Sequence, residues 1–236
     1  MLGLGGGLTG VVALDSAVTP NSISDLAFWF KNNTGVTAAQ WDDSSGNDNH
    51  MAQSTSGNQA SVSGGGLLLV DDNSDHYDLT TAVDIGASNA FTMICVMNIT
   101  SYDTVNTLLG DNNQSDKFLQ MQSADQVRLR QTGTAAVLKF EDSGNFPVGT
   151  KYMITVTKDT SRNLVVYKNG SVLTQQSSTG TPVATGVFAT DQIGGRSASP
   201  DLDFDGAIFE LLLYEKLLSS EELTGVHAEI QSRNGL

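Results

Sequence analysis

FDGAIFELLLYEKLLSSEEL, residues 204–223, carries an apolar, strand-like run into the start of a helix. Ser219 occupies the N-cap position of that helix, and Glu222, three residues later, completes a capping box. Leu218 and Leu223 flank the cap as a hydrophobic staple, which fixes the direction in which the chain enters the helix. The stretch therefore predicts a buried strand followed directly by a helix.

The helix is expected to cover about residues 219–231. Leu223, Val226 and Ile230 form one apolar stripe at helical spacing. Because a helix with a single apolar stripe buries it against another layer, this helix should close the chain by docking on a sheet.

Strand-like patterns dominate the chain before this point. The clearest segments are FTMICVMNI (91–99), FLQMQ (118–122), QVRLRQ (126–131), YMITVTK (152–158) and LVVYKNGSVL (164–173). In QVRLRQ the apolar residues should face the interior, while Arg128 and Arg130 face solvent. Asn169 and Gly170 tolerate the positive φ angles of a type I′ turn, so they predict a tight hairpin. Many short strands separated by turns favour an antiparallel sandwich or jelly roll.

Composition and charge narrow the range of functions. The chain has 236 residues, 24 of them glycine, and only 16% of its residues are charged, which suits one all-β domain with many turns. Its net charge is −14, and its closest basic pair is Arg128 and Arg130, so nucleic acid is not expected as a partner. No apolar run reaches the ~20 residues of a membrane helix, so no membrane partner is expected either. Cys95 lies in an apolar run and should be buried and unreactive.

Two stretches resemble the laminin-G-like, concanavalin A-like family of lectin and glucanase jelly rolls. WDDSSGNDNH (41–50) is similar to the family turn W-x-D-x-S-G-N-x-N-H, matched by Trp41, Asp43, Ser45, Gly46, Asn47, Asn49 and His50. Later in the chain, a Y-x-N-G hairpin, an I-G-G turn, the strand F-x-G-x-I-x-E and the helix start L-S-x-x-E follow in the family's order. The resemblance spans roughly residues 25–232. It implies an all-β, two-sheet antiparallel jelly-roll sandwich with one short C-terminal helix, and it implies no activity.

Residues 1–20 differ from this domain because they are rich in glycine and only weakly apolar. They predict an N-terminal arm, followed by a single domain over residues 21–236. The opening MLGLGGGLTG is similar to the openings of some tailed-phage virion proteins. That resemblance implies a virion location, with the arm binding neighbouring subunits.

Three aspartates at the end of the chain raise the question of calcium. Asp201, Asp203 and Asp205 match the opening of an EF-hand loop, but Leu212 stands where that loop needs a bidentate glutamate. The aspartates alternate with apolar residues, which predicts a strand with one solvated acidic face. One calcium ion bound by this face together with a neighbouring edge stays open as an alternative; no metal or cofactor is otherwise expected.

ELLLYE (210–215) resembles the E-x-D-x-x-E strand of laminarinase-type glucanases at its two outer positions, Glu210 and Glu215. Leu212 replaces the motif's aspartate, and three consecutive leucines describe a core strand. Residues five apart on a regular strand also point to opposite faces, whereas a retaining mechanism needs its carboxyl groups ~5–5.5 Å apart. The pattern therefore favours a structural Glu210 and predicts no catalytic residue.

Aromatic residues are the remaining candidates for ligand contact. Trp29 and Trp41 lie in core-like contexts, whereas Tyr102 and Phe146 lie in loop-like segments and are the predicted exposed platform for a sugar.

Three functions follow from these observations. The leading prediction is a non-enzymatic structural or decoration protein of a virion, part of a homo-oligomer or larger assembly, whose lectin-like domain touches host glycans. The second is a free carbohydrate-binding module, with or without calcium. The third is a laminarinase-type glycoside hydrolase.

Overall fold

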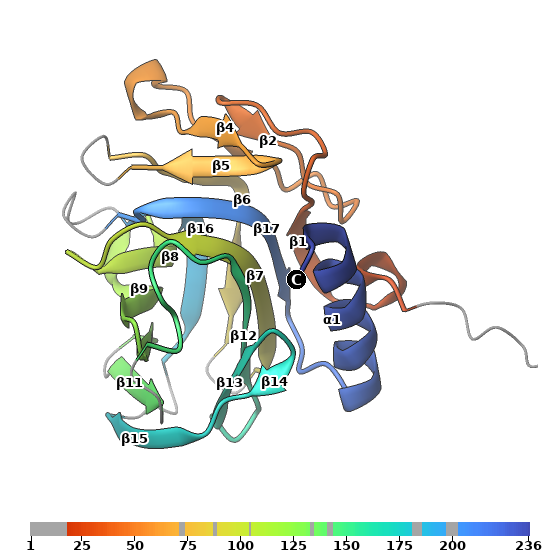
Figure 1. The fold of residues 1–236 in the computed structure, drawn as a ribbon, viewed down its shortest axis with the longest axis vertical. Coiled ribbons are helices and arrows are strands. Elements are labelled where there is room, and N and C mark those ends of the chain that lie inside the picture. Colours follow the sequence, from red (N-terminus) through yellow and green to blue (C-terminus); the bar gives the residue numbers. More distant parts are fainter. Residues whose placement is uncertain are drawn as a thin grey trace, which may run out of the picture.

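A computed structural model describes residues 18–70, 74–86, 89–103, 105–132, 135–140, 144–180, 186–196 and 203–236. This part of the chain forms two antiparallel sheets packed face to face, with one α-helix at the C-terminal end (Figure 1). The predicted all-β, two-sheet jelly-roll sandwich with a short C-terminal helix is confirmed. Residues 1–17 lie outside the described residues, so the division into an arm (1–20) and a domain (21–236) stays a prediction.

The first sheet carries the helix on its outer face. Its strands are β1 (Leu26–Phe30), β4 (Ser61–Ser63), β5 (Gly66–Leu69), β7 (Phe91–Ile99), β12 (Tyr152–Lys158), β13 (Leu164–Lys168), β14 (Ser171–Val172) and β17 (Gly206–Tyr214). They are ordered β14–β13–β12–β7–β17–β5–β4, and β1 also pairs with β17. Both β7 and β12 begin and end where the sequence predicted them.

The second sheet has nine strands among the described residues. They are β2 (Gln40–Trp41), β3 (Met51–Ala52), β6 (Tyr77–Ile85), β8 (Asn106–Asp111), β9 (Gln114–Ser123), β10 (Gln126–Arg130), β11 (Ala135–Phe140), β15 (Gln175–Thr179) and β16 (Phe188–Ile193). Their order is β15–β11–β10–β9–β8–β16–β6–β3–β2. Two short 3-10 helices, η1 (Pro20–Ser22) and η2 (Ser56–Asn58), complete the described elements.

The predicted hairpin at residues 169–170 is confirmed. Asn169 has φ 48° and Gly170 has φ 80°, and together they join β13 to β14. Positive φ at both positions matches the right-handed twist of the flanking strands. A local two-residue signal was therefore enough to place this turn.

Strand β17 is buried on both faces, which explains its run of three leucines. Leu211 and Leu213 point into the core between the two sheets. Leu212 and Tyr214 point the other way, into a second apolar cluster beneath the helix. A strand that alternated apolar and polar residues would have only one apolar face, so it could pack against one of these two clusters but not both.

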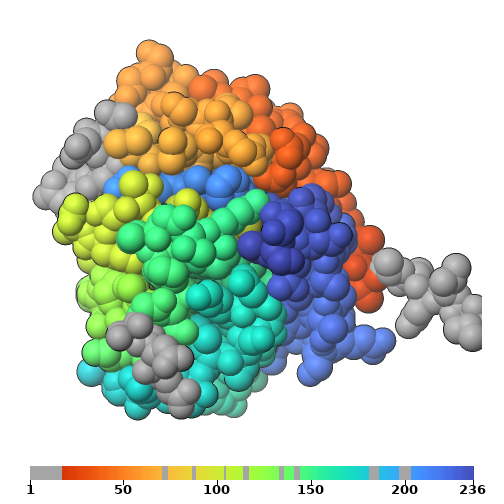
Figure 2. All heavy atoms as spheres, viewed as in Figure 1, coloured from red at the N-terminus to blue at the C-terminus, as the bar shows by residue number. Residues whose placement is uncertain are grey.

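The helix α1 (Ser220–Asn234) begins as the sequence predicted. The Ser219 hydroxyl accepts a hydrogen bond from the main-chain N–H of Glu222 at 3.2 Å, and the Ser219 N–H donates to the Glu222 carboxylate at 2.8 Å. Leu218 and Leu223, the predicted staple, are both buried. The helix runs beyond the predicted end and stops at Gly235, whose φ of 69° suits a helix C-cap. In Figure 2, α1 (dark blue) lies between the N-terminal strands (red to orange) and the strands β12–β14 (green to cyan).

A buried carboxylate ties α1 to the first sheet. Glu210 lies on β17, and its side chain has no exposed surface. The indole N–H of Trp29 on β1 donates to its Oε1 at 2.8 Å, and the Asn234 amide at the end of α1 donates to its Oε2 at 2.6 Å. The guanidinium of Arg233 forms an ion pair with the same carboxylate. The first strand, the last strand and the helix thus share one buried charge.

Arg233 is positioned by several further contacts. Its guanidinium lies over the Trp29 ring, 5.1 Å from the centroid, and also pairs with Glu229 one turn earlier. Burial raises the pKa of Glu210, and the Arg233 charge opposes that rise together with the hydrogen bonds from Trp29 and Asn234. Because a buried carboxylate is costly without such partners, all of these groups must be in place together.

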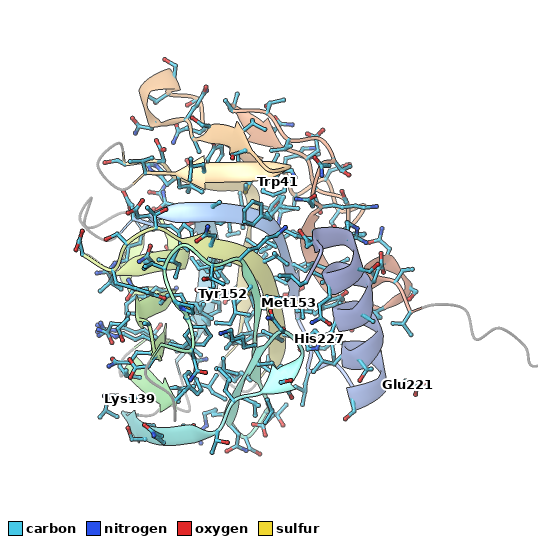
Figure 3. The ribbon with its side chains drawn as sticks, viewed as in Figure 1. Trp41, Lys139, Tyr152, Met153, Glu221 and His227 are labelled. Atoms are coloured by element: carbon cyan, nitrogen blue, oxygen red, sulfur yellow. The ribbon has the colours of Figure 1, made fainter. Side chains whose placement is uncertain are left out.

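His227 is a further buried polar side chain between α1 and the first sheet. It points from the helix toward β12, whereas Glu221 points away from the sheets (Figure 3). Its Nε2 lies 2.9 Å from the Thr155 hydroxyl, and its ring packs edge-on against Tyr167, with the ring centroids 5.8 Å apart. Burial lowers the pKa of His227 to about 4, from an ordinary value of 6.5.

We expect this histidine to make the fold sensitive to acid. The unfolded chain binds a proton to His227 near pH 6.5 and the folded chain only near pH 4, so protonation favours unfolding between these values. As the pH falls across this window, the free energy of unfolding should drop by roughly 3 kcal/mol on account of this group. Urea unfolding of the parent and of His227→Gln, measured from pH 7 to pH 4, checks this.

The His227→Gln variant should lose that part of the pH dependence, and His76→Gln serves as a control for removing an imidazole elsewhere. Equal pH dependence in the parent and His227→Gln would contradict the prediction.

Candidate functional site

The two residues of the predicted aromatic platform do not form an exposed pair, because Phe146 is buried and Tyr102 is half-buried. Phe146 has no exposed area. Its ring packs edge-on against that of Phe140, with the ring centroids 5.8 Å apart, and also packs against that of Tyr152, with the centroids 5.7 Å apart. Tyr102 packs against the core and donates its hydroxyl to the main-chain oxygen of Phe146 at 3.0 Å. Burial raises the pKa of Tyr102 to about 12. The prediction of an exposed Phe146 was wrong because its ring joins the core cluster with Phe140 and Tyr152.

The acidic stretch differs from the predicted strand. Asp201 lies outside the described residues, and β17 starts only at Gly206. Asp203 and Phe204 are both buried, so these neighbours do not alternate between an apolar and a solvated face. The strand prediction for this segment was therefore wrong. In the described ranges, no group of three or more His, Cys, Asp or Glu side chains is arranged to hold a metal ion.

The structure separates Glu210 and Glu215, as the strand geometry predicted. Glu210 is enclosed between the first sheet and α1, where it contacts Trp29, Arg233 and Asn234. Glu215 follows β17 and is exposed. Its main-chain N–H donates to the Asp25 carbonyl at 2.8 Å, and its side chain lines a surface hollow. The two glutamates thus have different surroundings and do not share a cleft.

This hollow, which we call the acidic hollow, is the candidate functional site. It has a volume of about 430 Å³ and is built from four segments that are distant in the sequence. They are the start of β1, the turn over residues 41–50, the middle of β6 and the residue after β17. Its lining residues are Asp25, Leu26, Ala27, Asn47, Asn49, Thr81, Ala82, Val83, Asp84 and Glu215.

The turn over residues 41–50 shapes one wall of the acidic hollow. The Asp43 carboxylate accepts the main-chain N–H groups of Trp29 at 2.8 Å and of Asn49 at 3.0 Å. The Asn47 amide donates to the Leu26 carbonyl at 2.6 Å. These hydrogen bonds fasten the turn to β1 and give the family-like motif a structural role.

Three carboxylates, those of Asp25, Asp84 and Glu215, face this hollow and reach solvent. Partial burial raises the pKa of Glu215, and the negative charges of Asp25 and Asp84 raise it further. The described lining contains no aromatic ring. Carboxylate oxygens accept hydrogen bonds, so the hollow suits a ligand that carries several hydroxyl donors.

A larger hollow of about 560 Å³ lies between the loop that follows β1 and the strand β4. Its lining holds one carboxylate, Asp42, which already accepts a hydrogen bond from the Gln40 amide at 2.6 Å. It brings together fewer groups that could hold a ligand. The acidic hollow is therefore the stronger candidate.

No local pattern in the sequence predicts the acidic hollow. Asn47 and Asn49 belong to the family-like turn over residues 41–50, and Glu215 is one outer position of the glucanase-like motif. Nothing local connects them to Asp25 or Asp84, because each reaches the hollow from its own segment. Only the pairing of β1 with β17 and the packing of the two sheets bring them together.

Several solved structures are similar to this chain. A Trypanosoma rangeli sialidase has a TM-score of 0.58 and 19% identity over 91% of this chain and 35% of its own. The binding domain of Paraclostridial Mosquitocidal Protein 1 has a TM-score of 0.57 and 15% identity over 88% of this chain and 52% of its own. The botulinum neurotoxin serotype C1 binding domain has a TM-score of 0.59 and 14% identity over 90% of this chain and 52% of its own.

This chain thus spans about a third of the sialidase and about half of each toxin binding domain. At these identities the likeness concerns the fold alone. No curated protein sequence matches the chain. A model of the Concanavalin A-like lectin/glucanases superfamily matches residues 71–224, more than half of the chain. The chain therefore belongs to the concanavalin A-like lectin/glucanase superfamily.

Proposed function

We propose that this chain is a non-catalytic, lectin-like module that binds a glycan in the acidic hollow. The observation that carries the proposal is the convergence of three solvent-facing carboxylates on one hollow of about 430 Å³. Sugar hydroxyls donate hydrogen bonds to carboxylates, and a rigid wall keeps those acceptors in place. The turn held by Asp43 supplies such a wall.

The absence of catalysis is part of the proposal. In the glucanase-like motif the two glutamates would have to face one sugar ring, but Glu210 is enclosed beneath α1. A retaining mechanism requires both carboxyl groups within reach of the same bond. The sandwich itself supports a binding role: two of the similar structures are binding domains of toxins.

We also propose a location for the module. It would decorate a virion, within a homo-oligomer or a larger assembly, and residues 1–20 would attach it to other subunits. The support is the glycine-rich sequence MLGLGGGLTG and its similarity to the openings of tailed-phage virion proteins. Among the described residues, the chain reaches the domain beside α1: Val18 lies next to Gly225, and the Tyr214 hydroxyl donates to the Pro20 carbonyl at 3.2 Å.

The glycan proposal predicts specific losses of binding. The full chain should bind members of a broad glycan array, tested with and without calcium, and titration calorimetry gives the dissociation constants. Asp84→Asn and Glu215→Gln should each weaken binding at least tenfold, because each removes a charged acceptor from the hollow. Asp78→Asn is the matched control, since this exposed aspartate lies on the same strand, β6, but outside the hollow.

Absence of binding to any glycan, or equal losses in Asp78→Asn and Asp84→Asn, would refute glycan binding in the hollow. Hydrolysis of a bound glycan by the parent chain would refute the non-catalytic role.

The arm proposal is tested separately by deleting residues 2–18. The truncated chain should still fold, as a monomer, but fail to join the particle, or the oligomer, that the full chain forms. Light scattering gives the mass of each form in solution, and particle composition shows incorporation. Normal assembly of the truncated chain would rule out attachment through the arm.

A further inference from the structure

An aromatic ring on the outer face of the second sheet is covered by positive charges. Phe118 lies on β9 but belongs to neither apolar cluster, unlike its neighbour Leu119, which points into the core. Phe118 is nevertheless only 1% exposed. The guanidinium carbons of Arg128 and Arg196 lie 5.0 Å and 4.9 Å from the ring centroid. Arg130 stands directly across from Phe118 in the pairing of β10 with β9.

A glycine allows the third arginine to join this group. A Cβ atom placed on Gly110 of β8 would lie 2.0 Å from the Gly195 carbonyl oxygen and 2.9 Å from the Arg196 Cβ. Because position 110 has no side chain, the Gly195–Arg196 segment can lie against the outer face of β8. Arg196, which follows β16, thereby reaches the ring on β9. We call Arg128, Arg130 and Arg196 the arginine cluster.

The guanidinium groups of this cluster are close enough to repel one another. Partial burial lowers the pKa of Arg128, and the charge of Arg130 lowers it further. Burial likewise lowers the pKa of Arg196, with additional contributions from Arg128 and Arg130. The cluster holds three of the chain's 12 basic residues, although the chain also has 26 acidic residues. Gathering them in one place costs free energy unless a negative group joins them.

That negative group is not supplied by the described residues around Arg128 and Arg130. The Nε atoms of both are buried without a hydrogen-bond partner in the described part of the chain, and neither guanidinium forms an ion pair there. Acidic residues at nearby strand ends are engaged elsewhere, Asp111 with Lys117 and Asp125 with Lys139. Buried N–H donors without acceptors are rare in folded proteins and call for an explanation.

We infer that the arginine cluster binds an oxyanion carried by a glycan, either the carboxylate of an acidic sugar or a sulfate ester. The fork of N–H groups in a guanidinium matches two oxygens of such an anion, and a site with several guanidiniums holds it through charge-assisted hydrogen bonds. The cluster lies on the second sheet, and none of its residues lines the acidic hollow. It therefore adds selectivity for charge to a module that would otherwise bind through its carboxylates.

The identification of the carrier as a glycan rests on the proposed function, whereas the oxyanion site rests on the cluster alone. The experiment compares three kinds of oligosaccharide with the full chain by titration calorimetry. They are a sialylated trisaccharide and an oligogalacturonate as carboxylates, a heparin-derived oligosaccharide as a sulfate, and neutral oligosaccharides as the reference. The acidic sugars should bind at least tenfold more tightly than the neutral ones at low salt, and that preference should shrink as salt is added.

Arg128→Gln combined with Arg130→Gln should reduce binding of the acidic sugars to the level of the neutral ones. Lys139→Gln is the control, because it removes a nearby positive charge that Asp125 already offsets. Arg128→Lys combined with Arg130→Lys keeps the charge but loses the fork, so it should weaken binding of the acidic sugars about tenfold. If the glutamine variant does not fold, this lysine variant decides the question.

The outcomes distinguish the oxyanion site at the arginine cluster from glycan binding in the acidic hollow. Binding of neutral sugars that the arginine variants leave unchanged, with no preference for acidic ones, overturns the oxyanion site and leaves the proposed function standing. Binding of no sugar overturns the proposed function and the glycan carrier with it. A preference for carboxylates over sulfates, or the reverse, identifies which oxyanion the cluster takes.

Discussion

The outer layer of this molecule depends on the buried carboxylate of Glu210. It has no exposed surface and is held by groups from the first strand and from the end of the helix, Trp29, Arg233 and Asn234. Removing a charge from water costs several kcal/mol, so the carboxylate is tolerable only with these partners assembled around it. The same residue that makes the sequence resemble a glucanase is therefore committed to joining α1 to the first sheet.

Because Glu210 is buried in this structural role, the groups that could bind a ligand lie elsewhere, in the acidic hollow and in the arginine cluster. The acidic hollow is lined by Glu215, which follows β17, and by Asp84 on β6. The arginine cluster lies on the outer face of the second sheet. The first site offers hydrogen-bond acceptors and the second offers charged donors, so the two would contact different parts of a large ligand. The chain has a net charge of −14, so an anion is attracted only where positive charges gather locally, as the guanidiniums of the arginine cluster do.

The features that could be predicted from sequence are those with a local physical cause. The cap at Ser219 and the turn at Asn169 follow from a few adjacent residues, and both agree with the structure. Phe146 was misjudged because its burial depends on rings from other loops and strands. Asp203 was misjudged because alternation in the sequence does not require a strand. Arg196 joins the arginine cluster only through the absence of a side chain on a neighbouring strand, which no local pattern reveals.

A double-mutant cycle on Glu210 and Arg233 tests the structural role of Glu210 most directly. Urea unfolding of the parent, Glu210→Gln, Arg233→Gln and the double variant gives four free energies of unfolding. Arg233→Gln should cost about 3 kcal/mol, because it leaves the buried carboxylate of Glu210 without its ion pair. Glu210→Gln should cost less, because Arg233 keeps its ion pair with Glu229. The double variant should be more stable than the sum of the two costs predicts, by at least about 1 kcal/mol. Costs that add within about 0.5 kcal/mol would show that the two residues act independently, and would contradict the role assigned to this buried pair.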